Sequence, residues 1–165
     1  MAFPSIPTSA AGRILTAANT AGGATSTFPD LTSLTKNAGD LLIAIIATYD
    51  GNSTNAEFST WGGGFTEFVD QATTATMGIG AAYKWSTGSE TGTFTVTTAD
   101  TSTTDRAMIL MSIPGAHGST PPEGGTIING TAAAADIAAL NPAGWDVEDT
   151  LWIAVCGSGE TSTTG

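Results

Sequence analysis

The chain has 165 residues, a length that suits one domain with a core large enough to fold alone. Its formal net charge is −11, with only four Lys and Arg residues, so a nucleic-acid backbone and an anionic membrane surface would both be repelled. We therefore expect no nucleic acid and no membrane among its partners. Charged residues make up only 12% of the chain, which is rich in threonine, serine and glycine. Because β-branched threonine suits a pleated surface that meets water, this composition predicts an all-β protein.

The sequence has no segment typical of export or of membrane insertion. Residues 1–15 lack a basic start followed by a continuous apolar region, so they do not match a secretory signal. The longest strongly apolar run, residues 41–47, is too short to span a bilayer. Cys156 is the single cysteine, which excludes an internal disulfide, and its apolar neighbours predict a small core residue. We expect a protein made without a signal peptide.

The first part of the chain predicts an arm and then strands. Residues 1–12 are rich in proline, serine and alanine and predict an extended N-terminal arm, followed by a single domain over residues 13–165. Residues 13–18 predict a short strand, and the polar loop of residues 19–30 has room for an edge strand. Residues 39–50 are the strongest strand candidate. Their apolar residues are continuous rather than alternating, which predicts that both faces of this strand are covered.

The middle of the chain predicts a β-hairpin. Residues 61–71 combine a glycine triplet with the start of a strand, and residues 77–85 alternate cleanly between two faces. "STGSETG", residues 86–92, predicts the hairpin turn, with Glu90 in it. Residues 93–98 return with Phe94 and Val96 on one face. One face of the strand before the turn carries Met77, Ile79, Ala81, Tyr83 and Trp85, and the other carries Gly78, Gly80, Ala82 and Lys84.

The last part of the chain predicts two more buried strands. Residues 106–113 predict a strand buried on both faces, residues 114–125 a long Pro/Gly loop, and residues 149–156 a final strong strand. Residues 131–145 are ambiguous, since alanine favours helix but no apolar face is clear. Short strands at regular spacing with polar turns are typical of an antiparallel β-sandwich, and we predict a jelly-roll-like one.

The segment around the last predicted strand is weakly similar in sequence to an earlier segment of the chain. Residues 39–54 and 148–163 share an acidic residue, an apolar run and a polar turn, but only the first copy is followed by a tryptophan, a glycine-rich turn and a hairpin. Two explanations stay open. Either the domain is incomplete at its C-terminus, or its last strand pairs with another subunit.

No catalytic constellation stands out in the sequence. His117 lies in a Pro/Gly loop without a nucleophile pattern nearby, which predicts an exposed loop residue. Asp50, Asn52 and Asn55 have spacing that resembles a calcium loop, but the later bidentate glutamate is missing, so we interpret them as a strand-end turn. We therefore predict no catalytic residues, no metal site and no cofactor, and a protein that is not an enzyme. No spacing singles out a pair for glycoside hydrolysis among Glu57, Glu67, Asp70, Glu90, Asp100 and Asp105.

Three aromatic residues are the candidates for ligand binding. Trp61, Tyr83 and Trp85, with Phe65 nearby in the sequence, offer rings that can stack on the apolar face of a sugar. Tyr83 and Trp85 also continue the stripe that begins at Met77, and a stripe in register with aliphatic residues is usually core. The sequence therefore favours a role in core packing for these aromatic residues, and a ligand-binding role stays open as the alternative.

An ordered set of short motifs runs through the chain. It begins with "MAFP", "GDLL" (39–42) and "GFTEF" (64–68), and continues with "AAYKWSTGSETGTFTVT" (81–97), "ILMSIPGA" (109–116) and "DTLWIA" (149–154). In this order the set resembles small β-rich structural proteins of tailed bacteriophages, over most of residues 1–156. Such proteins usually continue past the last motif through another turn and further strands, and this chain departs from them there.

The resemblance implies a virion structural protein, made in the host cytoplasm, and no catalytic residues. We expect a capsid decoration (cement) protein on the outer surface of the particle, which binds the major capsid protein and copies of itself as a homo-oligomer. Binding only the assembled shell would stabilise that shell by mass action. The arm of residues 1–12 would lie across a neighbouring subunit. The alternative is a tail-fibre or head-fibre adhesin module that binds host surface glycans, and a hydrolase domain is the third possibility.

Overall fold

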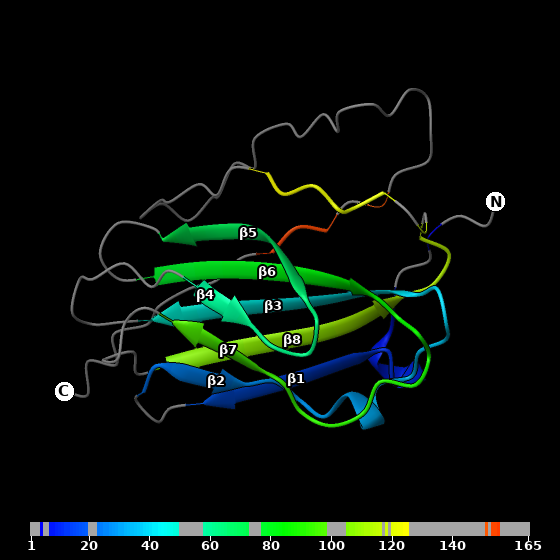
Figure 1. Ribbon diagram of the computed structural model, residues 1–165, viewed down its shortest axis with the longest axis horizontal. Helices are drawn as coiled ribbons and strands as arrows, with labels where there is room; N and C mark the ends of the chain where they lie inside the picture. The colour runs from blue at the N-terminus through cyan, green and yellow to red at the C-terminus, as the bar shows by residue number, and fades with distance from the viewer. Residues whose placement is uncertain are drawn as a thin grey trace.

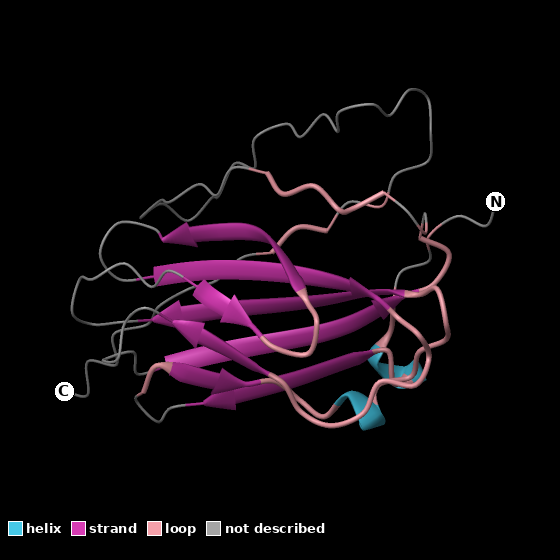
Figure 2. Cartoon of the chain, viewed as in Figure 1, coloured by secondary structure: helices cyan, strands magenta, loops and turns pink. Residues whose placement is uncertain are grey.

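The computed structural model is all-β, and its strands form two antiparallel sheets (Figures 1 and 2). The structure describes residues 4, 7–19, 23–49, 58–72, 77–98, 105–116, 118, 120–125, 151 and 153–155. Its strands are β1 (Ile14–Asn19), β2 (Thr25–Thr27), β3 (Leu41–Tyr49), β4 (Phe58–Trp61), β5 (Thr66–Ala72), β6 (Met77–Trp85), β7 (Thr95–Thr98) and β8 (Asp105–Ile113). Two single 3₁₀ turns are η1 (Ser9–Ala11) and η2 (Leu31–Ser33).

The larger sheet has the strand order β1-β8-β3-β6-β5 and the smaller sheet the order β2-β7-β4. The predictions of an all-β fold and of antiparallel sheets are therefore confirmed. β3 is central in the larger sheet, paired with β6 on one side and β8 on the other. Since a central strand of a covered sheet is buried on both faces, its sequence is a continuous apolar run, as predicted for residues 39–50.

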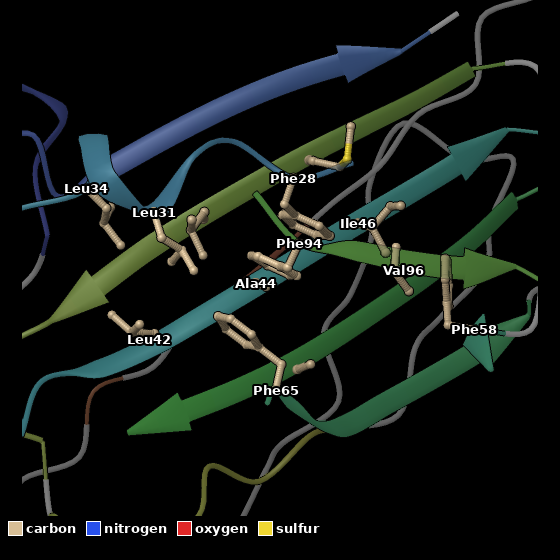
Figure 3. Packing of buried hydrophobic residues seen from close by; sticks show 13 residues of the cluster. Phe28, Leu31, Leu34, Leu42, Ala44, Ile46, Phe58, Phe65, Phe94 and Val96 are labelled. Carbon is tan, nitrogen blue, oxygen red and sulfur yellow. The ribbon is translucent and has the colours of Figure 1, made fainter. Parts of the chain in front are cut away.

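The two sheets face each other across a first core cluster, so the fold is sandwich-like (Figure 3). The larger sheet contributes even-numbered residues of β3, such as Leu42 and Ile46, since alternate side chains of a strand point to opposite faces. The smaller sheet and its loops contribute aromatic rings. Phe28 stacks on Phe94 with ring centroids 4.6 Å apart, and Phe65 stacks on the other side of Phe94 at 4.4 Å. Burial of these large rings stabilises the contact between the two sheets.

The outer face of the larger sheet carries a second core cluster. Odd-numbered residues of β3 lie here, and Ala116 and Leu151 pack against them from the segments that follow β8. Gly124 lies so close to Val69 and Phe68 of β5 that no side chain would fit there. The larger sheet is thus covered on both faces, by the smaller sheet and by irregular chain. The buried members of this second cluster are Leu41, Ile43, Ile45, Ala81, Met111 and Ile113.

The prediction of a final strand over residues 149–156 is wrong for its described part. Leu151 and residues 153–155 form no strand, and the side chains of Ile153 and Val155 are 41% and 38% exposed. Leu151 packs on the outer face of the larger sheet. A strand needs a partner edge as well as β-branched residues, and this segment covers a face of the sheet without joining an edge.

The predicted hairpin of residues 81–97 is also wrong, although its strands and its turn exist. β6 belongs to the larger sheet, whereas β7 belongs to the smaller sheet and pairs with β2 and β4. The chain therefore crosses from one sheet to the other after its turn. The backbone before β7 is held by the loop that precedes η2, since Phe28 N donates to Phe94 O and Leu31 N donates to Gly92 O. Phe94 and Val96 do share a buried face, as predicted.

The N-terminal segment is partly tied to the sheets. Ser9–Ala11, within the segment predicted as an N-terminal arm, forms a 3₁₀ turn. Thr35 N donates to Gly12 O, and Arg13 N donates to Thr8 O, which fastens this turn beside the start of β1. The division into an arm over residues 1–12 and a single domain over residues 13–165 stays a prediction, and the ambiguous segment of residues 131–145 lies outside the described residues.

Candidate functional site

The three aromatic candidates do not form one platform. Trp61 on β4 packs against the first core cluster, whereas Tyr83 and Trp85 on β6 pack against the second. The larger sheet lies between these clusters, because the first faces the smaller sheet and the second lies on the outer face. The structure therefore brings Tyr83 and Trp85 together and separates both from Trp61.

Tyr83 and Trp85 are half-buried neighbours on the outer face of the larger sheet. Tyr83 lies opposite Ile43 on β3, and Trp85 lies opposite Leu41, so both continue the aliphatic surface of the central strand. The ring of Phe68 meets Tyr83 edge-on at a centroid distance of 6.1 Å. Tyr83 and Trp85 thus pack against the second core cluster and remain partly accessible to solvent. Such an arrangement allows the same aromatic residues to pack in the core and to contact a ligand.

Trp61 forms a polar contact at the side of the sandwich where β4 and β5 lie. Its indole Nε1 donates to Glu67 Oε2 at 2.6 Å. A bulge in the pairing of β5 with β6 between Glu67 and Val69 places Glu67 and Asp70 on the side of β5 that faces β4. Burial raises the pKa of Glu67, against the hydrogen bond from Trp61, and the charge of Asp70 raises it further.

Glu90 is part of the framework of the turn that follows β6. Its side chain is buried and accepts hydrogen bonds from Ser86 Oγ at 2.9 Å, from Thr87 N at 2.6 Å and from Thr87 Oγ1 at 3.0 Å. Burial alone would raise the pKa of Glu90, but these hydrogen bonds outweigh it and lower the pKa to about 2. A carboxylate that stays ionised at neutral pH cannot act as a general acid, and its oxygens are already used to hold the turn.

Asp40 plays the same structural role just before β3. Its Oδ2 accepts from Arg13 Nη1 at 2.7 Å, from Asn37 N at 2.9 Å and from Ser112 Oγ at 3.0 Å. Burial acts to raise the pKa of Asp40, and the hydrogen bonds from these three groups lower it below its usual value. Because Arg13 precedes β1 and Ser112 lies on β8, this carboxylate fastens three strands of the larger sheet at one end.

Sequence reasoning missed a buried cation at the opposite end of the sandwich. Arg106 on β8 is only 3% exposed, and its guanidinium donates to the backbone oxygens of Gly23 and Thr25 beside β2. Burial lowers its pKa. The sequence signal was a charged residue at the head of the apolar run of residues 106–113, in a chain with only four Lys and Arg residues.

Several candidates from the sequence lie outside the described residues. They are His117, Asp50, Asn52, Asn55, Glu57, Asp100 and Cys156. Among the residues that the structure does describe, no group of three or more His, Cys, Asp or Glu side chains is placed to hold a metal ion. None of the helices in that same part of the chain is long and apolar enough to cross a membrane.

Comparison with known proteins adds no relative. No family model, no curated protein and no solved structure matches the chain.

Proposed function

We propose that this chain is a structural protein of a tailed-bacteriophage virion, a capsid decoration protein that binds the outer shell and stabilises it. The support is the ordered motif set of residues 1–156 together with the architecture. The described carboxylates with the strongest hydrogen bonding, Asp40 and Glu90, hold strands and turns. We also propose a jelly-roll-like arrangement of the sandwich. The described residues form eight strands in two antiparallel sheets, and a jelly roll has eight strands.

One observation carries the proposal that the chain docks on another subunit. Residues 151–155 have the composition of a buried strand, yet Ile153 and Val155 expose large apolar side chains two and four residues after Leu151, which packs on the outer face of the larger sheet. Exposed apolar residues on a segment of this composition suit contact with a neighbouring protein, by packing or by strand addition. In this proposal the neighbour is the major capsid protein, with further contacts between copies of the chain.

The direct test is to locate the protein in intact particles. Cryo-electron microscopy of particles that contain it should show density on the outer capsid surface. Shells stripped of the protein should also break at a lower temperature than coated shells. Density at the tail would overturn the decoration role and favour the adhesin. Absence of the protein from purified particles would overturn both, and equal breakage temperatures would contradict stabilisation of the shell.

A pair of variants tests the docking segment. Ile153→Asp with Val155→Asp should reduce binding to stripped shells at least tenfold, because two charges replace apolar contact area. The matched control is Thr93→Asp with Thr95→Asp, which adds the same charge at two exposed positions, one just before β7 and one at its start. The control should bind like the unmodified protein. Equal loss in both variants would show a general charge effect and contradict a contact at residues 151–155.

The adhesin alternative rests on Tyr83 and Trp85. They are adjacent and half-buried on one face of β6, as a small sugar-stacking surface requires. Binding of the protein to a panel of bacterial surface glycans, measured with and without Tyr83→Ala, tests it. A glycan that binds the unmodified protein and loses at least tenfold in affinity on that change would favour the adhesin. Lack of binding to every glycan would count against it.

A further inference from the structure

Among the residues that the structure describes, three buried side-chain polar atoms have no hydrogen-bond partner. They are Ser26 Oγ, Thr48 Oγ1 and Arg106 Nε. In natural proteins such atoms are few, and each leaves a cost of roughly 1–3 kcal/mol. Three of them together at one end of a single core therefore point to a missing partner. We call Ser26, Thr48 and Arg106 the end cluster.

The strand pairing brings the end cluster together. Thr48 on β3 and Arg106 on β8 are directly opposite each other, and both side chains are buried on the face that looks toward the smaller sheet. Arg106 reaches across to that sheet, because its Nη1 donates to Thr25 O at 2.7 Å and its Nη2 donates to Gly23 O. Ser26 is the next residue of β2, and its side chain is fully buried. The pairing of Thr48 with Arg106, and the contact of Arg106 with the residue before Ser26, thus place the three residues of the end cluster near one another, where β8 reaches across to β2.

The end cluster has donors and positive charge but, among the described residues, no negatively charged acceptor. An arginine Nε is only a donor, and a serine or threonine hydroxyl can donate to any acceptor within reach. Among the described residues, no carboxylate forms an ion pair with Arg106, whose hydrogen bonds go to neutral carbonyl oxygens. A buried charge without a counter-charge is strongly unfavourable. A water molecule would supply an acceptor but would leave this charge uncompensated.

We propose that the end cluster binds a small inorganic anion of the chloride class. Such an ion is an acceptor only, takes several hydrogen bonds at once and neutralises a guanidinium. It therefore accepts hydrogen bonds from all three orphaned atoms and also supplies the counter-charge that a neutral molecule lacks. The net charge of −11 opposes anions at long range, so the affinity arises from these local donors. The inference is independent of the proposed virion role.

Thermal unfolding in chloride and in gluconate, at constant ionic strength and pH 7, tests the proposal. Gluconate is too large for a buried site between strands. A bound ion stabilises the folded state by mass action, so the melting temperature should rise by about 3–6 °C for each tenfold increase in chloride above its dissociation constant. The rise should be absent in gluconate. Equal melting temperatures in the two salts would overturn the proposal.

Two sets of variants locate the effect. Ser26→Ala with Thr48→Val removes two donors while keeping the shape of the core, and it should abolish the dependence on chloride. In gluconate this variant should be as stable as the unmodified protein or more so, because two unpaired hydroxyls are gone. Ser112→Ala, which removes a buried hydroxyl at the other end of the sandwich, is the control and should keep the dependence. An unchanged chloride response in the double variant would contradict the proposal.

Crystals grown or soaked in bromide give an independent measurement. Bromide replaces chloride and has a strong anomalous signal, so a peak is expected beside Arg106 Nε. Crystals of Arg106→Gln should lack the bromide peak. In solution, the melting temperature of Arg106→Gln should no longer rise with chloride. Bromide peaks confined to other positions in the unmodified protein would overturn the site.

Discussion

Gly80 on β6 lies directly beneath the ring of Phe58, so closely that a Cβ on Gly80 would be 2.5 Å from Phe58 Cδ2. The ring fills the space that a side chain on the inner face of β6 would otherwise take. Phe58 starts β4 in the smaller sheet and is only 3% exposed. The contact therefore sets how closely the two sheets approach at this point, and a glycine inside a strand is explained by a close approach between layers.

Gly80→Ala should lower the free energy of unfolding by about 1–3 kcal/mol, because the added methyl group must displace a well-packed ring. Urea unfolding measures the loss. Adding Phe58→Leu should restore part of the stability lost in Gly80→Ala. Gly118→Ala is the control, since an added Cβ there meets no atom within 4 Å. If Gly80→Ala left the free energy of unfolding unchanged, the two sheets would be further apart at this point than the structure places them.

Glu90→Gln should destabilise the protein at pH 7 by about 2–3 kcal/mol, because the amide accepts the hydrogen bonds of the turn less well than the carboxylate. The pKa of Glu90 is lowered from 4.5 to about 2 in the folded protein. Its stabilising contribution is therefore present above pH 4.5 and is lost as the pH falls toward 2.

Unfolding free energies of the unmodified and Glu90→Gln proteins between pH 7 and pH 2.5 check this sign. The difference between the two curves should shrink below about pH 4.5. Asp105→Asn replaces an exposed carboxylate and should change the stability at pH 7 by less than about 0.5 kcal/mol. Parallel curves for Glu90→Gln and the unmodified protein would contradict the role given to this carboxylate.

Glu67→Gln should have the opposite effect and slightly stabilise the protein at pH 7. Burial raises the pKa of Glu67, so its ionised form is disfavoured in the folded state, and its contribution is lost as the pH rises through that pKa. Glutamine removes the charge beside Asp70 and keeps an oxygen for Trp61. Because Glu67 is exposed and screened by solvent, the gain should be below about 0.5 kcal/mol. Urea unfolding at pH 4 and pH 7 measures it, and a lower stability at pH 7 would be the contrary result.

Trp85→Ala should cost about 1–3 kcal/mol, less than the 3–5 kcal/mol expected for a fully buried aromatic residue such as Phe58. The reason is that Trp85 is half-buried on the second core cluster. Chemical denaturation of Trp85→Ala and Phe58→Ala compares the two positions directly. A loss near zero for Trp85→Ala would identify an exposed platform, and a loss equal to that of Phe58→Ala would identify a core residue.

Local patterns predicted the strongest strands well. Residues 39–50, 77–85 and 106–113 were predicted as strands and correspond to β3, β6 and β8. The period of two and the β-branched composition of a strand are properties of neighbouring residues, so they are visible in the sequence. The short strand β4 was missed, since four residues with irregular pairing to β7 leave little periodic signal.

The candidate site was only partly predictable. Residue type alone selected Trp61, Tyr83 and Trp85, but which side of the larger sheet each one faces depends on which strand pairs with which. The function of Glu90 had a local cause, because Ser86 and Thr87 lie within four residues of it. Arg106 could not be assigned from the sequence, because its carbonyl partners lie more than 80 residues earlier in the chain.

The acidic character of the chain, its strands and turns, and the burial of both faces of β3 could all be inferred from the amino-acid sequence. These properties follow from composition and from patterns within about ten residues. The crossing between sheets after Glu90, the packing of Phe58 on Gly80 and the contact of Arg106 with β2 became visible only in the folded structure. Each of these depends on pairing between distant strands, and the free energy of such contacts arises only once the sheets have assembled.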